Sequence, residues 1–373
     1  MPIYPRGSYQ VWLCNPYGHR LALLQGLQSI QYSRVNPVSA VGSFAINLGT
    51  QYDRLADIAC LVEIWRAPFR GHAYRHEGTY ILEKWQATGR YTRTLAGEHV
   101  NKLARFRIVT EYKETTYADK TGPGDDLIKQ YAREQLGALA QNADRDFNNW
   151  FPFTVEPAYG QWPTVTKEAS HANVLDTAQA IVKAVANDDA NPTWGMFEIV
   201  PTGHDLDFGV QLRTYTDYRD ADRGLDSLSP LVLSENDCLE GLKRTRDHDK
   251  EWTWAMVGGS GNGDGRQTVE VQDRERSSLA PWWRREVWSD GGDVPSVAAI
   301  TTRGYRKLRD GKPVDRFEAT LRPHPSLYYG GLLDLGGKYG VYGHGQFWSA
   351  RCEVVQVNAN ESSEKIDFKL ETV

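Results

Sequence analysis

The sequence contains little cysteine and no long apolar segment, and both absences narrow its class. Its four cysteines are far apart and none belongs to a Cys-x-x-Cys pair: Cys14, Cys60, Cys238 and Cys352. Without paired ligands a structural zinc site is not expected, and such scattered cysteines are typical of buried free thiols in a protein made in a reducing cytoplasm. No run of 18 apolar residues occurs, so we expect no transmembrane helix. The first eight residues lack a basic segment followed by an apolar one, so we expect no signal peptide.

The sequence also lacks the glycine motifs of nucleotide binding, although one segment is very rich in glycine. That segment, Gly258–Gly265, precedes Arg266 and not the Lys-Ser or Lys-Thr pair of a P-loop. The dinucleotide-binding pattern Gly-x-Gly-x-x-Gly fails at each of its glycines. A calcium-binding Gly-Gly-x-Gly-x-Asp repeat comes closer, but Asp264 is one position late and such sites need stacked copies. Alternating residues on both sides predict a long turn in a β-hairpin, with an ion or ligand contact as the alternative.

The titratable residues form no recognised catalytic or metal-binding set. His72 and His76 are four residues apart, but no glutamate follows His72, so the metalloprotease motif His-Glu-x-x-His is missing. Asp247-His248-Asp249 is an isolated cluster, for which cation binding is the alternative to a charged turn. No Gly-x-Ser-x-Gly motif occurs, and a glycosidase pair cannot be selected among 48 acidic residues. We therefore assign no catalytic, cofactor-binding or metal-binding residue and expect no enzyme activity.

Composition indicates a globular protein of more than one domain. The chain has 373 residues, 40% hydrophobic and 24% charged, and a single core stops growing at about 250–300 residues. The net charge of −5 argues against a general nucleic-acid-binding protein. Twelve tryptophans and nineteen tyrosines suit half-buried sheets and subunit interfaces. Because aromatic rings also stack on sugars, Trp282-Trp283 and Tyr328-Tyr329 keep a carbohydrate-binding module as an alternative.

Periodicity predicts many strands and three helices. The helices are expected over Asp125–Leu136, after a cap at Ser170 with apolar residues from Val174 to Val185, and over about Ser296–Arg309. Alternation predicts the strands. They are Tyr9–Leu13, Leu21–Ile30, Gln31–Val35, Gly42–Leu48, Leu61–Trp65, Thr79–Trp85, Gly195–Val200, Phe208–Arg213, Leu231–Ser234, Glu251–Val257, Gln267–Gln272, Phe317–Leu321, Phe347–Asn358 and Lys365–Leu370.

The order of these elements predicts a mainly β fold with α insertions, in the α+β class. We expect two antiparallel β-barrel-like domains, either barrels or sandwiches, each interrupted by a smaller insertion. The first would comprise residues 1–112 and 195–233, with a helix-containing insertion over 113–194. The second would comprise residues 234–275 and 315–373, with a small helical insertion over 276–314.

Four stretches in this order are similar to a known family. They are Tyr9–Gly18, Asp125–Gly137, Leu231–Arg266 and Leu332–Tyr342. Across nearly its whole length the chain resembles the tail hub, or baseplate hub, proteins of tailed bacteriophages, particularly of siphophages that infect actinobacteria. It departs from the family pattern in the last stretch, where Gly336-Gly-Lys stands in place of an expected Gly-Asp and leaves the local turn undefined.

The resemblance implies a structural protein of the virion tail tip that is assembled in the cytoplasm of the bacterial host. It implies a homotrimer whose two barrels per chain form a pseudo-sixfold ring, adapting the sixfold tail tube to threefold tip proteins. The implied partners are a distal tail protein or tube ring above, tip or fibre proteins below, and the tape measure protein. DNA would cross the ring without specific binding, and the protein would not insert into a membrane. Carbohydrate binding in host recognition, or cell-wall glycan hydrolysis, remains the alternative.

Overall fold

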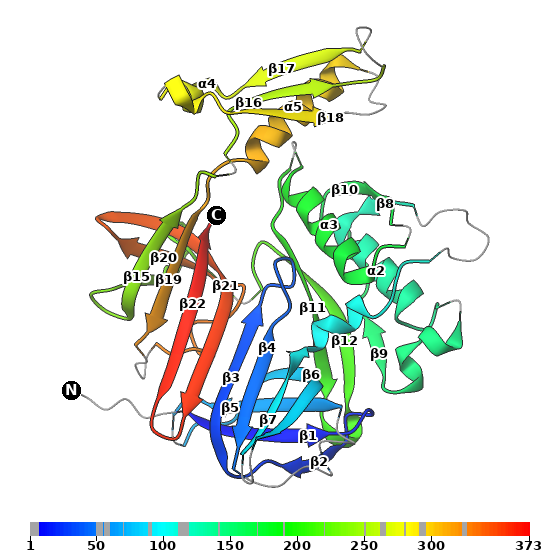
Figure 1. Cartoon of the computed structure of the whole chain (residues 1–373), viewed down its shortest axis with the longest axis vertical. Helices are drawn as coiled ribbons and strands as arrows, with labels where there is room; N and C mark the ends of the chain where they lie inside the picture. Colours follow the sequence, from blue (N-terminus) through cyan, green and yellow to red (C-terminus); the bar gives the residue numbers. More distant parts are fainter. Residues whose placement is uncertain are drawn as a thin grey trace. The chain divides into compact units, whose positions relative to one another are not determined.

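The computed structural model describes most of the chain, and strands dominate it. The described residues are 7–49, 55, 60–69, 71–88, 92–110, 119–140, 142–169, 171–188, 191–219, 221–249, 251–261, 266–279, 281–290, 296–322 and 327–373. The mainly β class with helical insertions is confirmed (Figure 1). Among these residues no helix is long and apolar enough to cross a membrane, and the four cysteines are free.

One extended, largely antiparallel sheet contains most of the strands. Its hydrogen-bonded order is β15-β19-β22-β21-β3-β4-β7-β6-β5-β1-β2, and β20 pairs with β21 and also with β13 and β14. The strands are β1 (Ser8–Cys14), β2 (Arg20–Leu23), β3 (Leu27–Val35), β4 (Ser43–Leu48), β5 (Leu61–Ala67), β6 (Arg75–Thr88), β7 (Thr92–His99), β13 (Asp222–Arg223), β14 (Val232–Ser234), β15 (Leu239–Arg246), β19 (Asp315–Leu321), β20 (Lys338–Gly343), β21 (Gln346–Asn360) and β22 (Glu364–Thr372).

The two expected barrels are joined in this sheet, and the described strands do not close into a ring. The long strand β21 is the reason. Gln346–Arg351 pairs with β20, whereas Val354–Asn360 pairs with β3, so one strand connects the N-terminal and C-terminal β regions. The register shifts between Cys352 and Val354 on the side that faces β22. A continuous apolar core runs beneath, from Val11 and Ile46 to Phe317 and Val357.

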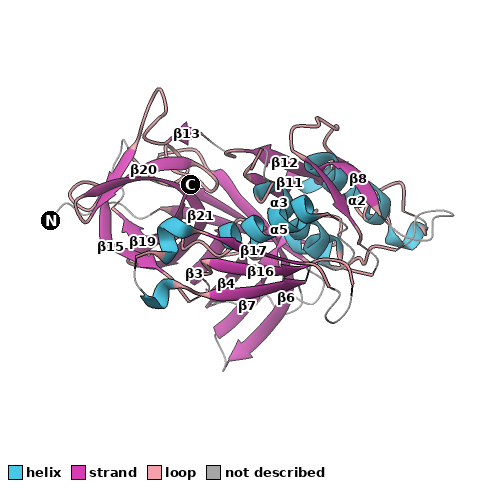
Figure 2. Ribbon diagram, turned by 90° about the horizontal axis from the view of Figure 1, so that it is seen from above, coloured by secondary structure: helices cyan, strands magenta, loops and turns pink. Residues whose placement is uncertain are grey.

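The helices α2 (Gly124–Gln135) and α3 (Val174–Ala186) confirm two of the predicted helices. They pack on each other and on a sheet of β11 (Gly195–Gly203), β12 (Gly209–Thr216) and β9 (Phe153–Val155) (Figure 2). A short pair, β8 (Lys120–Pro123) and β10 (Thr164–Lys167), lies beside them. The expected cap at Ser170 lies outside the described residues. Near the start of α3, the Asn173 Oδ1 accepts a hydrogen bond from the Asp176 amide at 2.8 Å.

Residues 244–316, with 187–192, form a separate compact unit. Its sheet has the order β17 (Thr268–Gln272), β16 (Trp254–Gly258), β18 (Glu286–Asp290), and a short helix α4 spans Arg274–Ser277. The third predicted helix is confirmed as α5 (Val297–Asp310), which begins after a Ser296 cap. Its Ile300 and Leu308 pack with Ala255 and Val257 of β16 in a small apolar core.

The contacts therefore divide the chain differently from the expected domains. The remaining residues, Met1–Ala186, Thr193–Lys243 and Phe317–Val373, form one unit that includes strands assigned in advance to both barrels. The segment expected as a purely helical insertion, 276–314, contributes β18, which pairs in parallel with β16. Strands β16 and β17 therefore lie in one sheet with β18 and pack against α5, whereas the sequence alone placed these two strands in the second barrel.

Candidate functional site

The glycine-rich segment lies where the sequence predicts, in a β-hairpin. Strands β16 and β17 pair antiparallel from Trp254↔Gln272 to Gly258↔Thr268. Arg266 folds back on the hairpin: its Nε donates to the Gly259 carbonyl at 2.9 Å, and its guanidinium lies over the Trp288 ring and pairs with Asp290. A Cβ at Gly258 would lie 2.6 Å from the Arg266 Nε, so any larger residue there would displace the Arg266 side chain. The segment's last four residues, 262–265, lie outside the described residues.

The histidines of the sequence analysis lie in structural contacts. His76 is on β6, where its Nε2 is 3.1 Å from the Thr79 Oγ1 and its ring is 4.7 Å from that of His204. Burial, together with His204, lowers the pKa of His76 to about 3. His248 pairs with Glu251 at 2.5 Å and packs edge-on against Trp283. In the described part of the chain no group of three potential ligands is placed to hold a metal ion.

The aromatic side chains considered for sugar binding differ in how far they are exposed to solvent. Tyr329 is fully buried, so it cannot present a ring face to a ligand in solvent. Trp283 packs on His248, whereas Trp282 is 75% exposed on the short 3-10 helix Pro281–Trp283. Trp282 is therefore the member of these pairs with the most open ring.

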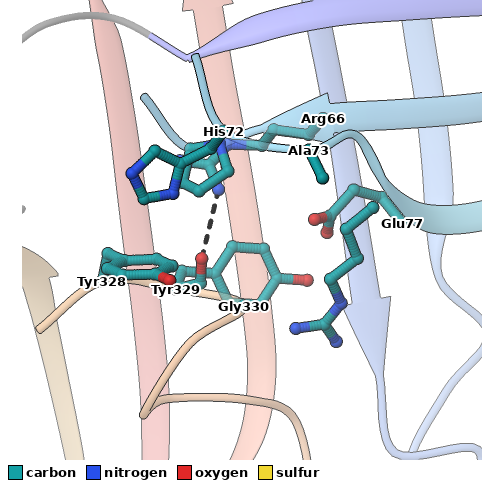
Figure 3. A pocket seen from close by; sticks show the side chains of 9 residues that line it. Arg66, His72, Ala73, Glu77, Tyr328, Tyr329 and Gly330 are labelled. Atoms are coloured by element: carbon teal, nitrogen blue, oxygen red, sulfur yellow. Dashed lines mark hydrogen bonds between the residues drawn. The ribbon is translucent and has the colours of Figure 1, made fainter. Parts of the chain in front are cut away.

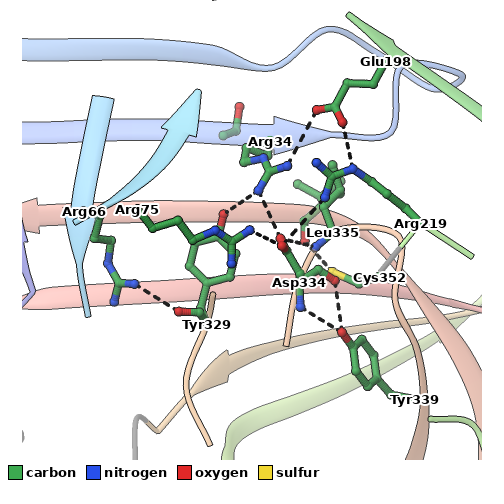
Figure 4. A network of polar contacts seen from close by, with 12 residues as sticks. Arg34, Arg66, Arg75, Glu198, Arg219, Tyr329, Asp334, Leu335, Tyr339 and Cys352 are labelled. Carbon is green, nitrogen blue, oxygen red and sulfur yellow. Dashed lines mark hydrogen bonds and ion pairs between the residues drawn. The ribbon is translucent and has the colours of Figure 1, made fainter. Parts of the chain in front are cut away.

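The main charged feature is a buried cluster around Asp334, just before β20 (Figure 4). The Arg34 guanidinium on β3 lies 3.1 Å from Asp334, Arg219 lies 3.7 Å from it, and Arg75 on β6 also pairs with it. Glu198 on β11 completes the cluster, at 2.8 Å from Arg219 and 3.7 Å from Arg34. The cluster therefore ties strands of the large sheet to the β11–β12 sheet.

A second buried pair ties the two ends of the chain together. Arg66 on β5 donates from Nε and from a terminal nitrogen to Glu364 on β22, each at 2.9 Å. The hydroxyl of Tyr9 on β1 also donates to Glu364. Arg66 further donates to the Tyr329 carbonyl at 3.2 Å, which links this pair to the segment that carries Asp334. Such bidentate geometry fixes orientation as well as charge.

The electrostatics of both groups favour the charged state. Burial opposes ionisation of Asp334, but Arg34, Arg75 and Arg219 outweigh it and lower its pKa to about 2. Burial also opposes ionisation of Glu364, and Arg66 outweighs it, so the pKa of Glu364 is lowered too. Removing one partner of such a pair leaves a buried charge uncompensated, which costs about 3–5 kcal/mol. The arrangement is suited to fixing the relative positions of strands.

A small pocket of about 170 Å³ adjoins these charges (Figure 3). Its lining includes Arg66, His72, Glu77, Tyr328 and Tyr329. Glu77 is almost completely buried, and its Oε2 accepts no hydrogen bond from the described residues. The described residues of the lining include no serine, threonine or cysteine nucleophile, and the volume is below the roughly 300 Å³ of a typical ligand pocket. The pocket has room for water or a small polar group beside the charge network.

Sequence reasoning missed the charge network, although a signal for it was present. Arg34, Arg66 and Glu198 are charged residues within strands that otherwise predict buried positions. A charge buried in a strand needs a partner, so these positions could have been marked as members of ion pairs. Their partners could not be named, because Arg34 and Asp334 are 300 residues apart in the sequence.

Comparison with known proteins identifies the fold. No family model and no curated protein sequence matches the chain. The 43 kDa tail protein of prophage MuSo2 from Shewanella oneidensis is similar in structure, with a TM-score of 0.59, 10% identity and 98% of each chain covered. A tail protein from Neisseria meningitidis MC58 gives a TM-score of 0.54 at 12% identity, covering 98% of this chain and 96% of that one.

A third solved structure agrees with these two. The prophage tail protein gp18 from Listeria monocytogenes EGD-e gives a TM-score of 0.50 at 10% identity, covering 96% of this chain and 94% of that one. In all three the likeness extends over nearly the whole of both chains. The chain therefore has the fold of phage tail proteins, and this confirms the fold indicated by the resemblance in its sequence.

Proposed function

We propose that this protein is a structural component of a phage tail and serves as the hub of the tail tip. The observation that carries this proposal is the end-to-end structural likeness to the MuSo2 43 kDa tail protein, with 98% of each chain covered. Fold alone does not define function, so the proposal also draws on the chemistry of the described residues.

The chemistry of the chain suits a role in assembly. The buried ion pairs Arg34–Asp334 and Arg66–Glu364 stiffen a sheet whose strands come from both ends of the sequence. Exposed aromatic and methionine side chains, among them Met256 and Trp288, are the residue types enriched at protein interfaces. The net charge of −5 suits a wall past which DNA must move without binding.

In the proposed assembly three copies form a ring that adapts the sixfold tail tube to threefold tip proteins. A distal tail protein or tube ring would bind above, tip or fibre proteins below, and the tape measure protein would be a further partner. The ring would sit at the virion tail tip after assembly in the host cytoplasm. The protein would act by holding these components in register, without catalysis.

The mass of the purified protein in solution tests this proposal. The chain has a mass of 42.1 kDa, and we expect a species of three times this mass, alone or after addition of the tail tube protein. Incubation with purified bacterial cell walls should release no soluble sugar. A protein that stays a monomer with every tail component added, or one that degrades cell walls, contradicts the structural hub.

A further inference from the structure

A groove lined by aromatic residues lies apart from the charge network, within the larger unit. The turn between β1 and β2, the segment before β9 and the 3-10 helix Asp205–Asp207 form it, and its volume is about 390 Å³. The groove is lined by Tyr17, His19, Trp150, Phe151, Pro152, Leu206, Asp207 and Phe208. Three large apolar side chains of this lining are exposed to solvent: Tyr17 by 47%, Trp150 by 50% and Leu206 by 78%. Large apolar side chains that cluster in this way mark a binding surface more often than single exposed ones do.

The turn that carries Tyr17 is fixed against the floor of the groove. The Asn15 Oδ1 accepts hydrogen bonds from the amides of Tyr17 and His19, at 2.9 and 3.0 Å. Gly18 has φ +83°, and a Cβ there would lie 2.0 Å from the Phe208 ring, so the turn packs directly on Phe208. The backbone that carries Tyr17 is thus held in place before any ligand arrives, which reduces the entropy lost on binding.

The Trp150 side of the groove is equally well supported. The Trp150 amide donates to the Phe147 carbonyl at 2.9 Å, and the Phe147 and Phe151 rings stack at 5.9 Å. Phe151 packs edge-on against Phe208 at 5.4 Å. The Trp150 segment and the turn that carries Tyr17 therefore both pack on Phe208. The rings of Trp150 and Tyr17 lie 6.0 Å apart with an angle of 31° between their planes. They therefore form two adjoining, half-exposed aromatic surfaces.

The polar groups of the groove select the class of ligand. Among the described residues that line it there is no lysine or arginine, the cations that bind phosphate or carboxylate groups. His19 and Asp207 supply hydrogen-bond donors and acceptors beside the rings. A ligand that suits this set is uncharged, has an apolar face to cover an aromatic ring and carries hydroxyl groups at its edge. A neutral pyranose ring has these properties.

We propose that this groove binds a neutral glycan, with sugar rings stacked on Trp150 and Tyr17 and hydroxyl groups hydrogen-bonded to Asp207 and His19. The site differs from the pairs that the sequence suggested for sugar binding, of which Trp282 retains an open ring. The proposal is independent of the hub assignment, because a tail protein can assemble whether or not this groove holds a sugar.

Titration calorimetry and tryptophan fluorescence of the full chain test the proposal. The probes are tetrasaccharides of N-acetylglucosamine, glucose and galactose, each added up to millimolar concentration. We expect at least one of them to bind, and Trp150→Ala to weaken that binding by about tenfold or more, since a stacked aromatic ring and its buried area are lost. Asp207→Asn should weaken it by a smaller factor. Trp282→Ala is the matched control, an exposed tryptophan outside the groove, and should bind as the parent protein does.

Each other result overturns the proposal. Absence of binding by all three tetrasaccharides does so, and so does equal loss of binding in Trp282→Ala and Trp150→Ala. If Trp150→Ala abolishes assembly with another tail protein while no sugar binds, the groove is a protein interface. Unchanged thermal unfolding of Trp150→Ala shows that lost binding is not lost folding, and Tyr17→Ala provides a second variant if Trp150→Ala unfolds.

Discussion

Asp334 illustrates how single residues hold this fold together. It is buried, and Arg34, Arg75 and Arg219 approach it from three different parts of the chain. No local sequence pattern predicts such a cluster, because each of its members is an isolated charge in the sequence. The sequence does reveal that Arg34 falls on the same face of an alternating strand as the buried Ile30 and Tyr32. A charge at such a position predicts that a partner exists without naming it.

Replacing Asp334 should therefore destabilise the protein strongly. In Asp334→Asn the buried Arg34 and the partly buried Arg75 and Arg219 lose the carboxylate that they share, and only Glu198 is left beside Arg34 and Arg219. We expect the free energy of unfolding to fall by about 3–5 kcal/mol. Glu318→Gln is the control, because Glu318 pairs at the surface with Lys243 and Lys369, and it should change stability by less than about 1 kcal/mol. Urea unfolding followed by tryptophan fluorescence compares them. Similar losses in both variants would mean that the cluster contributes no more than a surface pair.

His99 should make stability depend on pH. It is buried, and its Nδ1 accepts a hydrogen bond from the Asn101 amide at 3.3 Å, which requires an unprotonated nitrogen. Burial lowers its pKa from 6.5 to about 4, so below pH 6.5 the unfolded chain binds the proton more readily than the folded one. The stability is complete above pH 6.5 and is lost as the pH falls toward 4, by on the order of 3 kcal/mol from this residue.

The variant His99→Asn tests this dependence. Asparagine keeps an acceptor at the helix cap but does not titrate. Although the variant should be less stable than the parent at pH 7, its stability should fall less steeply between pH 6.5 and 4.5 in urea titrations. An identical slope in the two proteins would show that His99 does not carry the proton linkage.

At the scale of elements, periodic patterns in the sequence predicted where helices and strands lie, but they did not predict which strands pair. The helices α2, α3 and α5 and most strands lie where the spacing of apolar residues predicts them. Which strands pair depends on contacts that no local pattern encodes. The two halves of β21 have the same alternation, yet one pairs with β20 and the other with β3. The strand β18 (Glu286–Asp290) was missed for a different reason: it has only five residues and is flanked by charges, so its alternation is too brief to predict a strand.

The contact between α5 and its sheet is close enough to require glycine at position 304. A Cβ there would lie 2.4 Å from a methyl of Val271. Alanine favours helices by about 1 kcal/mol over glycine, but overpacking costs about 1–3 kcal/mol, so we expect Gly304→Ala to destabilise this unit. Thr302→Ala, on the exposed face of the same helix, should be neutral or slightly stabilising. Hydrogen exchange of α5 measured by mass spectrometry separates the two, and slower exchange in Gly304→Ala would contradict the packing argument.

The hairpin loop should matter for assembly and not for folding. The Gly259 amide donates to the Gln267 carbonyl at 2.7 Å, so replacing residues 260–266 by Asn-Gly closes a two-residue turn. We expect this variant to melt within a few degrees of the parent but to form less of the trimer. Arg266→Ala is the control for the arginine that the replacement removes. If the shortened protein assembles fully, the loop is a passive turn.

At the scale of the whole molecule, the resemblance in sequence led to the correct fold but not to the grouping of its parts. The resemblance rested on stretches such as Tyr9–Gly18 and Leu332–Tyr342, and the solved tail proteins share this fold at only 10–12% identity. Grouping depends on contacts between distant strands, and residues 244–316 form their own unit, in which β16 pairs with β17 and β18 and the sheet packs on α5. The trimeric ring is a property of several chains, so it stays a prediction.

Electron microscopy of the purified protein is the most direct test of the proposed hub. Class averages of negatively stained particles, taken with and without the tail tube protein, show both symmetry and the presence of a hole. The account predicts threefold rings with a central opening wide enough for duplex DNA. Compact single copies under both conditions, or closed particles without an opening, would contradict it.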